Sequence, residues 1–247
     1  MTASRYLIIN ADDFGHCTSI NRSIVEAHEN GVVTTASVLV RRPAAAEAFT
    51  YGRNHPCLDL GLHIDLGEWV YLGGSWTPRY HVVPLNEATA VRKEIWCQLA
   101  VFQGLAGKNP THIDSHQHVH LREPVRAAVL EIGEELGIPV RDCSQGIHYC
   151  GRFYGQTAEG LPYPEGITTN ALIDILGQLR PGVTELGCHP GTGRDPDTTY
   201  VRERAEEVKT LCDVRVRSAL ADMGIELCSF TAVRRFSTIS RLGSVAT

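Results

Sequence analysis

The sequence predicts an α/β fold in which parallel strands curl into a distorted, TIM-like (β/α) barrel of about seven βα units. Short apolar runs alternate with amphipathic stretches of helical length, the pattern of parallel strands joined by helices. The chain has 247 residues, close to the length of one barrel domain, and no repeat or linker divides it. We therefore expect a single domain over residues 1–247. An open, doubly wound sheet shares this pattern and stays an alternative.

Seven runs have the character of strands. The first is apolar and is closed by the turn-forming residues Asn10, Asp12 and Asp13, and the second is rich in β-branched residues. The remaining runs are short and apolar and lie between helical stretches. The expected strands are 6–9, 34–40, 58–64, 111–114, 138–141, 183–187 and 226–229.

Helices are expected between these strands. Gly31 marks the end of the first helix, Pro43 opens a short alanine-rich one, and Pro124 lies near the first turn of another. The region 142–169 is rich in Gly, Tyr and Pro and is expected to form a long functional loop. Besides the short helix that Pro43 opens, the expected helices are 19–30, 87–105, 123–136, 170–179 and 200–223.

Composition excludes several classes of partner. The formal net charge is −5 and no basic run is present, which argues against nucleic acid or an anionic membrane as the main partner. The apolar runs are far shorter than the ~18–20 residues of a membrane span, and the run at Leu7 is too short for a signal-peptide core. We therefore expect a cytoplasmic protein. Its eight cysteines form no Cys-x-x-Cys pair and are expected to be free thiols.

Polar residues gather where the expected strands end. In parallel α/β folds these carboxyl ends converge on one face, where sites form. Four separate segments therefore deliver carboxylates and imidazoles to one pocket. These residues are Asp12, Asp13, His63, Asp65, His112, Asp114, His116, His118, His120 and His189.

The adjacent aspartates Asp12 and Asp13 predict a bound cation. Two neighbouring carboxylates raise each other's pKa, and a divalent cation relieves that repulsion. One aspartate can then bind the metal while its neighbour acts as a base. The alternative is that Asn10-Ala-Asp-Asp serves only as turn chemistry.

The stretch from His112 to His120 carries the densest signal. On an extended strand every second residue from 112 to 120 shares one face, and on a helix 112, 116 and 120 do. Neutral imidazole is a common ligand of zinc and other divalent metals, and further histidines can orient the ligands or contact substrate. A histidine-rich loop without a site is the alternative.

Mixed Asp and His ligands without a cysteine cluster indicate a catalytic rather than a structural metal. A site of one Asp and two His leaves coordination positions open for water and substrate, which suits hydrolysis. The same ligand set also suits non-haem iron oxygenases, so ligand type leaves the reaction open.

Four ordered motifs resemble the YdjC-like (ChbG/HpnK) carbohydrate deacetylase family over about positions 6 to 230. They are Ile9-Asn-Ala-Asp-Asp-Phe-Gly15, Gly61-Leu-His63, Thr111-His-Ile-Asp-Ser-His-Gln-His-Val-His120 and His189-Pro-Gly191. The resemblance implies a distorted barrel and one divalent metal ion, Mg²⁺ or Zn²⁺, with others possible. It also implies that the chain hydrolyses the N-acetyl group of a small-molecule amino sugar or chitooligosaccharide, releasing acetate, and forms a homodimer.

The resemblance also suggests roles for individual residues. His63 and His116 match the family's metal histidines, and Asp13 is the third expected ligand. By analogy with the Asp-Asp pair of polysaccharide deacetylases, Asp12 is the expected base, and His189 would stabilise the oxyanion or protonate the leaving amine. The expected substrate contacts are His118, His120 and Tyr154, with Trp69 and Trp76 as further rings that could stack on sugars.

Two other functions fit the residues. One is another metal-dependent hydrolase, either a phosphoesterase or an amidohydrolase, although these commonly carry a His-x-His pair on the first strand, where this chain has Asp12 and Asp13. The other is a non-catalytic sugar- or metal-binding protein, which leaves a candidate base beside a metal ligand unexplained.

Overall fold

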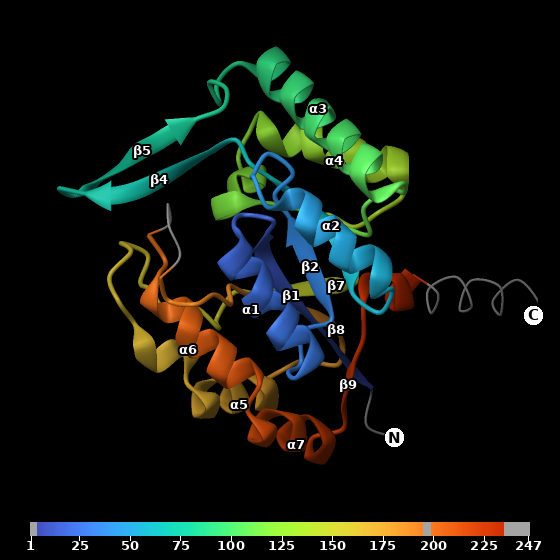
Figure 1. Ribbon diagram of the computed structural model, residues 1–247, viewed down its shortest axis with the longest axis vertical. Coiled ribbons are helices and arrows are strands. Elements are labelled where there is room, and N and C mark those ends of the chain that lie inside the picture. Colours follow the sequence, from blue (N-terminus) through green and yellow to red (C-terminus); the bar gives the residue numbers. More distant parts are fainter. Residues whose placement is uncertain (1–3, 195–198, 235–247) are drawn as a thin grey trace, which may run out of the picture.

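A curled parallel sheet forms the centre of the protein. The computed structural model describes residues 4–194 and 199–234. The strand order is β6-β3-β2-β1-β8-β7, and β9 pairs with the first residues of β1 (Figure 1). This half-barrel confirms the predicted α/β, barrel-like class. The strands are β1 (Arg5–Phe14), β2 (Thr35–Val38), β3 (Asp59–Ile64), β6 (Ile113–Ser115), β7 (Ile147–Cys150), β8 (Gly182–Cys188) and β9 (Ile225–Leu227).

Helices lie around this sheet in the order expected from the alternating pattern (Figure 1). Within the described residues, none is long and apolar enough to cross a membrane. The predicted domain of 1–247 also includes residues 1–3, 195–198 and 235–247, which lie outside the described ranges. The helices are α1 (Thr18–Glu29), α2 (Ala45–Asn54), α3 (Ala88–Ala106), α4 (Val125–Leu136), α5 (Thr169–Gly177), α6 (Arg202–Leu211) and α7 (Val214–Asp222).

Three predicted elements differ from the structure. The first strand, expected over 6–9 and closed by Asn10, Asp12 and Asp13, continues through these residues to Phe14, because β1 pairs with β8 as far as Ala11 and with β2 as far as Phe14. The expected strand 138–141 is reduced to one bridge between Ile113 and Val140, because the chain turns there and the Ser144 hydroxyl accepts from the Val140 N–H at 2.8 Å. The expected helix 200–223 is divided into α6 and α7. The first helix ends at Leu211, and Asp213 caps the second, its carboxylate accepting from the Arg215 N–H at 2.9 Å.

Five further elements were not predicted. The expected loop 142–169 contains the edge strand β7 and a 3₁₀ turn, η2 (Pro164–Ile167). The histidine-rich stretch leaves β6 and enters another 3₁₀ turn, η1 (His116–Leu121), so neither a continuous strand nor an α-helix carries it. An antiparallel hairpin of β4 (Gly67–Leu72) and β5 (Ser75–His81) projects from the sheet (Figure 1).

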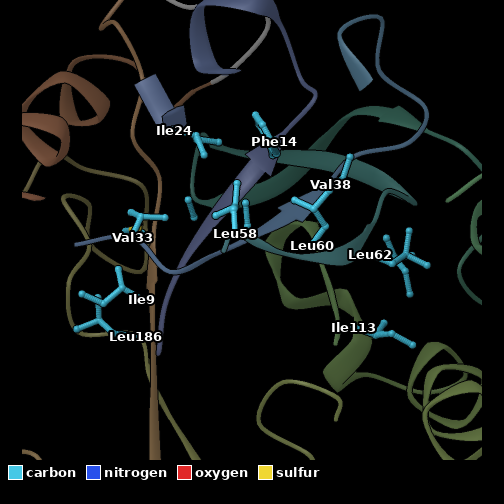
Figure 2. Packing of buried hydrophobic residues seen from close by; sticks show 14 of the residues in the cluster. Ile9, Phe14, Ile24, Val33, Val38, Leu58, Leu60, Leu62, Ile113 and Leu186 are labelled. Carbon is cyan, nitrogen blue, oxygen red and sulfur yellow. The ribbon is translucent and has the colours of Figure 1, made fainter. Parts of the chain in front are cut away.

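The central strand β1 presents different chemistry on its two faces. Leu7 and Ile9 belong to the large apolar core between sheet and helices, which Figure 2 shows around Ile9, Leu60 and Leu186. Because side chains alternate along a strand, Ile8, Asn10 and Asp12 share the other face. Ile8 packs in a small cluster with Phe230, and Asn10 and Asp12 are hydrogen bonded to one another. The interior of the half-barrel is therefore apolar at one end and polar toward the carboxyl ends.

Gly61 in β3 makes room for a buried histidine in this interior. A Cβ atom at position 61 would overlap the His112 imidazole. That ring stacks on Phe230 with 3.9 Å between centroids, and its Nε2 lies 3.0 Å from the Ser37 hydroxyl. The glycine of the Gly61-Leu62-His63 motif is thus required by packing.

Replacing this glycine is expected to destabilise the fold. Gly61→Ala should lower the free energy of unfolding by about 2 kcal/mol, the usual scale for overpacking a filled interior. Urea denaturation measures this change. In the control Gly104→Ala, on α3 with open space around the position, stability should rise by about 0.5–1 kcal/mol through helix propensity. Equal effects of the two substitutions would contradict the packing role of Gly61.

Candidate metal centre

A β-bulge turns Asp12 and Asp13 toward the same site. Adjacent residues of a regular strand point to opposite faces, but the register of β1 against β2 shifts between Ala11 and Phe14. Asp13 also has a positive φ of 67°, a conformation in which Asp is one of the more tolerated residues. Both carboxylates consequently lie at the carboxyl end of β1, where each is buried.

Asp13 meets two histidines from separate segments. Its Oδ1 lies 3.1 Å from His116 Nδ1 and 3.4 Å from His63 Nε2. His63 is near the end of β3, and His116 begins η1 directly after β6. One ligand atom from each of the three residues lies within 4.8 Å of the others. The structure therefore brings the three predicted metal ligands together.

These donors fit a divalent cation. One carboxylate and two imidazoles suit zinc and several other divalent metals. The His116 Nε2 atom is buried and has no hydrogen-bond partner within the described ranges. This nitrogen is therefore available to bind a cation. Among the described residues the group comprises three side chains, one fewer than the four protein ligands usual in structural zinc sites.

Asp114 orients His63. Its Oδ1 lies 2.8 Å from His63 Nδ1, so the imidazole presents Nε2 toward Asp13. Carboxylates commonly hold metal-binding histidines in this way. Burial lowers the pKa of His63, but the neighbouring carboxylates of Asp114, Asp13 and Asp12 outweigh it and raise this pKa to about 10. Without a metal ion, the ring is therefore protonated at neutral pH.

Arg141 holds the other aspartate. Its guanidinium donates to both oxygens of Asp12 at 2.7 Å and to Glu185 Oε1 at 2.6 Å, and its Nη2 forms an ion pair with Asp114 Oδ2 at 2.6 Å. Burial raises the pKa of Asp12, yet the Arg141 charge and hydrogen bonds lower it below its usual range. Asp12, His63 and Asp114 also lie within 4.8 Å of one another, but Arg141 already bridges the two carboxylates. The positive charge of Arg141 therefore already balances the two carboxylates of this second group.

Arg204 on α6 pairs with the second oxygen of Asp13. Its Nη2 lies 2.6 Å from Asp13 Oδ2, and its Nε donates to the Tyr200 carbonyl at 2.7 Å. Burial raises the pKa of Asp13, but Arg204 and the neighbouring histidines bring it well below the usual value. Asp13 is thus ionised, with Oδ2 paired to a cation and Oδ1 facing the two histidines.

His189 lies beside Asp12 at the end of β8. Its Nε2 is 3.7 Å from Asp12 Oδ2, and its Nδ1 is 4.0 Å from Glu207 Oε1. Its backbone N–H and the Tyr200 hydroxyl both donate to Glu207. Burial lowers the pKa of His189 to about 4 and raises the pKa of Glu207 to about 8. His189 is therefore a neutral imidazole at pH 7.

One cavity of about 470 Å³ opens onto these groups. Its lining contains Asp12, Asp13, His63, His116 and His189, together with the expected substrate contacts His118 and Tyr154. The third expected contact, His120, is fully buried, and its two ring nitrogens lie within hydrogen-bonding distance of the Ser115 hydroxyl and the Arg141 carbonyl. This placement argues against a substrate contact for His120 and gives it a role in supporting η1.

Three residues of the site were not singled out from sequence. Arg141 ends an expected strand, so the strand-end argument that found the histidines could also have found it. Arg204 and Glu207 lie on α6 among several other charged residues, and no local pattern separates them from an exposed face. Their burial becomes evident only when α6 is placed against the end of β1.

The fold and the site define an α/β half-barrel protein with a three-residue candidate cation site at the carboxyl ends of its strands. A family model described as "YdjC-like protein" matches residues 6–222. The chain belongs to this family, which confirms the resemblance found in its motifs.

Three known proteins show how far the similarity extends. The carbohydrate deacetylase of Geobacillus stearothermophilus is 30% identical, covering 92% of this chain and 97% of that protein. The chitooligosaccharide deacetylase of Salmonella schwarzengrund is 30% identical, covering 92% and 98%. A structure from Enterococcus faecalis, named as a proposed cellobiose-phosphate cleavage protein, superposes with a TM-score of 0.74 at 25% identity, covering 94% and 99%.

Binding of a metal ion is expected to release about one proton, because His63 must lose its proton to act as a ligand. The apparent Kd should therefore fall about tenfold for each unit of pH between pH 7 and pH 8. Calorimetric titration with Mn²⁺ in buffers of different ionisation enthalpy measures both quantities. Binding without proton release would contradict the protonated state of His63. In the control His63→Gln, affinity should be weaker and the released proton lost.

Proposed function

We propose that the chain is a metal-dependent carbohydrate deacetylase that hydrolyses the N-acetyl group of an amino sugar or chitooligosaccharide. The relatives named as deacetylases cover nearly the whole chain and support the reaction class. One observation carries the proposal: an ionised carboxylate, Asp12, is fixed beside a separate three-ligand group in the same cavity. This arrangement supplies a base and a cation site together, as hydrolysis of an amide requires.

Asp13, His63 and His116 would hold one divalent ion. Such an ion, when bound, polarises a carbonyl oxygen and lowers the pKa of water. The donor set accepts both Mg²⁺ and Zn²⁺, and the choice between them stays a prediction. A single domain over 1–247, a homodimer and a cytoplasmic location also stay predictions.

Asp12 is the proposed general base. Arg141 keeps it ionised and prevents rotation of its carboxylate, so an oxygen is ready to receive a proton from water. Its low pKa makes Asp12 a weak base. A weak base is sufficient if a bound metal ion lowers the pKa of the attacking water.

His189 is the proposed proton donor to the leaving amine. A neutral imidazole has first to gain a proton, and Asp12 Oδ2 lies 3.7 Å from its Nε2. The proton that Asp12 takes from water can therefore pass to His189 and then to the amine nitrogen as acetate leaves. His118 and Tyr154 are the proposed substrate contacts, since both line the cavity.

Acetate release tests the reaction directly. Metal-stripped protein, resupplied with Zn²⁺, Mg²⁺, Mn²⁺ or Co²⁺, is expected to release acetate from N-acetylated mono- or oligosaccharides only when metal is present. Phosphate release from sugar phosphates is measured in parallel. Phosphate without acetate would replace the proposal by the phosphoesterase alternative.

Substitution of the two aspartates should separate their roles. Asp13→Ala is expected to abolish both metal binding and turnover, because it removes a ligand. Asp12→Asn should retain metal binding but lower kcat by about 10²-fold or more, the scale of a lost general base. Calorimetry measures binding and acetate release measures kcat. Full turnover by either variant would overturn its assigned role.

A further inference from the structure

The β4–β5 hairpin, residues 67–81, is here called the aromatic arm. It projects from the sheet (Figure 1), and Trp76 near its tip is 53% exposed. Tyr71 and Trp76 face each other across the two strands with ring centroids 5.6 Å apart. Trp69, Tyr71 and Trp76 line the same cavity as the candidate metal ligands. The arm thus forms an aromatic wall that extends outward from the metal centre.

Other segments complete the lining of this cavity. Tyr154 stacks on Tyr200 at 4.7 Å between centroids, and Gln156, Thr157 and Glu159 add polar groups. Aromatic rings and hydrogen-bonding groups in one cavity match a sugar ring, which has apolar C–H faces and hydroxyl groups at its edge. Since the cavity contains both the candidate metal ligands and the arm, an oligosaccharide that runs outward from the metal centre would contact both.

The root of the arm is fixed on the side of His63. Two residues beyond His63, the Asp65 N–H donates to Gln98 Oε1 at 2.9 Å, and Gln98 Nε2 donates to the Asp65 carbonyl at 2.7 Å. The Tyr80 hydroxyl of β5 also donates to Asp65 Oδ1 at 2.7 Å. These contacts hold the beginning of β4 and the end of β5 together.

Gln117 fixes the arm on the side of His116. The Trp69 N–H donates to Gln117 Oε1 at 2.8 Å, and Gln117 Nε2 donates to the Trp69 carbonyl at 2.8 Å. Across the hairpin, Trp69 pairs with Pro78, which has no N–H to offer. The side-chain amide of Gln117 therefore acts as a substitute strand partner for Trp69.

The backbone around Gln117 adopts an uncommon conformation. Gln117 and His118 have φ values of 50° and 53°, in the left-handed region that residues other than glycine rarely adopt. Such conformations persist where surrounding contacts hold them and are common at functional sites. Here they turn the chain immediately after His116, so the residue that grips the arm is the direct neighbour of a candidate metal ligand.

We propose that the aromatic arm binds the sugar units beyond the acetylated one, and that Gln117 is the positioning residue that fixes the arm relative to the metal centre. This inference rests on the proposed deacetylase function. Binding energy from remote sugar units would then help to place the acetyl group, so longer substrates depend more on the arm than a monosaccharide does.

Kinetics on substrates of different length test the inference. Gln117→Ala should raise KM for N,N′,N″-triacetylchitotriose about tenfold, the usual scale for losing two hydrogen bonds, and should raise KM for N-acetylglucosamine by a smaller factor. Trp76→Ala, an exposed change that the fold tolerates, should also raise KM for the trisaccharide. The matched control is Gln103→Ala. Within the described part of the chain its amide bonds Asn109, away from the cavity lining, and its loss should leave both KM values unchanged.

The Mn²⁺ affinity of each variant distinguishes two roles of Gln117: positioning the aromatic arm, or only supporting its neighbour His116. Unchanged affinity with a length-dependent KM supports the inference, whereas weaker metal binding with equal loss on both substrates overturns it. Triacetylchitotriose binding to Asp12→Asn protein with and without Gln117→Ala, followed by tryptophan fluorescence, needs no turnover. Weaker binding in the double variant supports the arm even if the wild type releases no acetate. Equal binding and an unchanged KM overturn the arm while leaving the deacetylase function intact.

Discussion

The site depends on the ion pairs that the buried guanidinium of Arg141 forms with its neighbouring carboxylates. A buried charge is tolerated only when it is paired and fully hydrogen bonded, and Arg141 contacts three carboxylates from three strands of the sheet. Two of those carboxylates define the chemistry: Asp12 faces the cavity, and Asp114 orients His63. One cation therefore sets the position of both the proposed base and a candidate metal ligand. Burial raises the pKa of the third carboxylate, Glu185, to about 7, which limits the negative charge around Arg141.

The convergence of the site could be predicted from sequence because it follows from topology. Parallel strands bring their carboxyl ends together, so Asp13, His63 and His116 meet although they are far apart in sequence. Which atoms face one another could not be predicted. It depends on a bulge and a positive φ at Asp13, and on an arginine of α6 that pairs with its second oxygen. His120 shares the motif of His116 and His118 but is turned inward by η1, a rotation that residue spacing does not encode.

The fold shows a similar division. Most of the long amphipathic helices and buried strands were predicted to within a few residues, because burial imposes their period. The strand β1 is an exception, since it continues to Phe14 beyond its expected end at Ile9. Elements stabilised by single polar contacts were not. Asp213 divides one expected helix by capping the next, the turn at Val140 shortens an expected strand, and an exposed hairpin depends on Gln98 and Gln117 rather than on an apolar face. The two hairpin contacts come from side chains 33 and 48 residues away in sequence, so local patterns carry no record of them. The Asp213 cap and the Ser144 contact are local, but each is a single polar hydrogen bond that the apolar periodicity does not mark.

The pairing of Asp13 with Arg204 also bears on the order in which the site is completed. The two residues are separated by 191 positions. A growing chain that has already produced β1, β3 and β6 contains all three candidate ligands, yet the arginine that balances Asp13 has still to be synthesised. Contacts between residues so distant in sequence form late, because the entropy of closing a long loop is lost before the contact stabilises the fold. Under the proposed function, a cation that meets the nascent chain would therefore encounter an incomplete site, and retention of a metal would report finished folding rather than nucleate it.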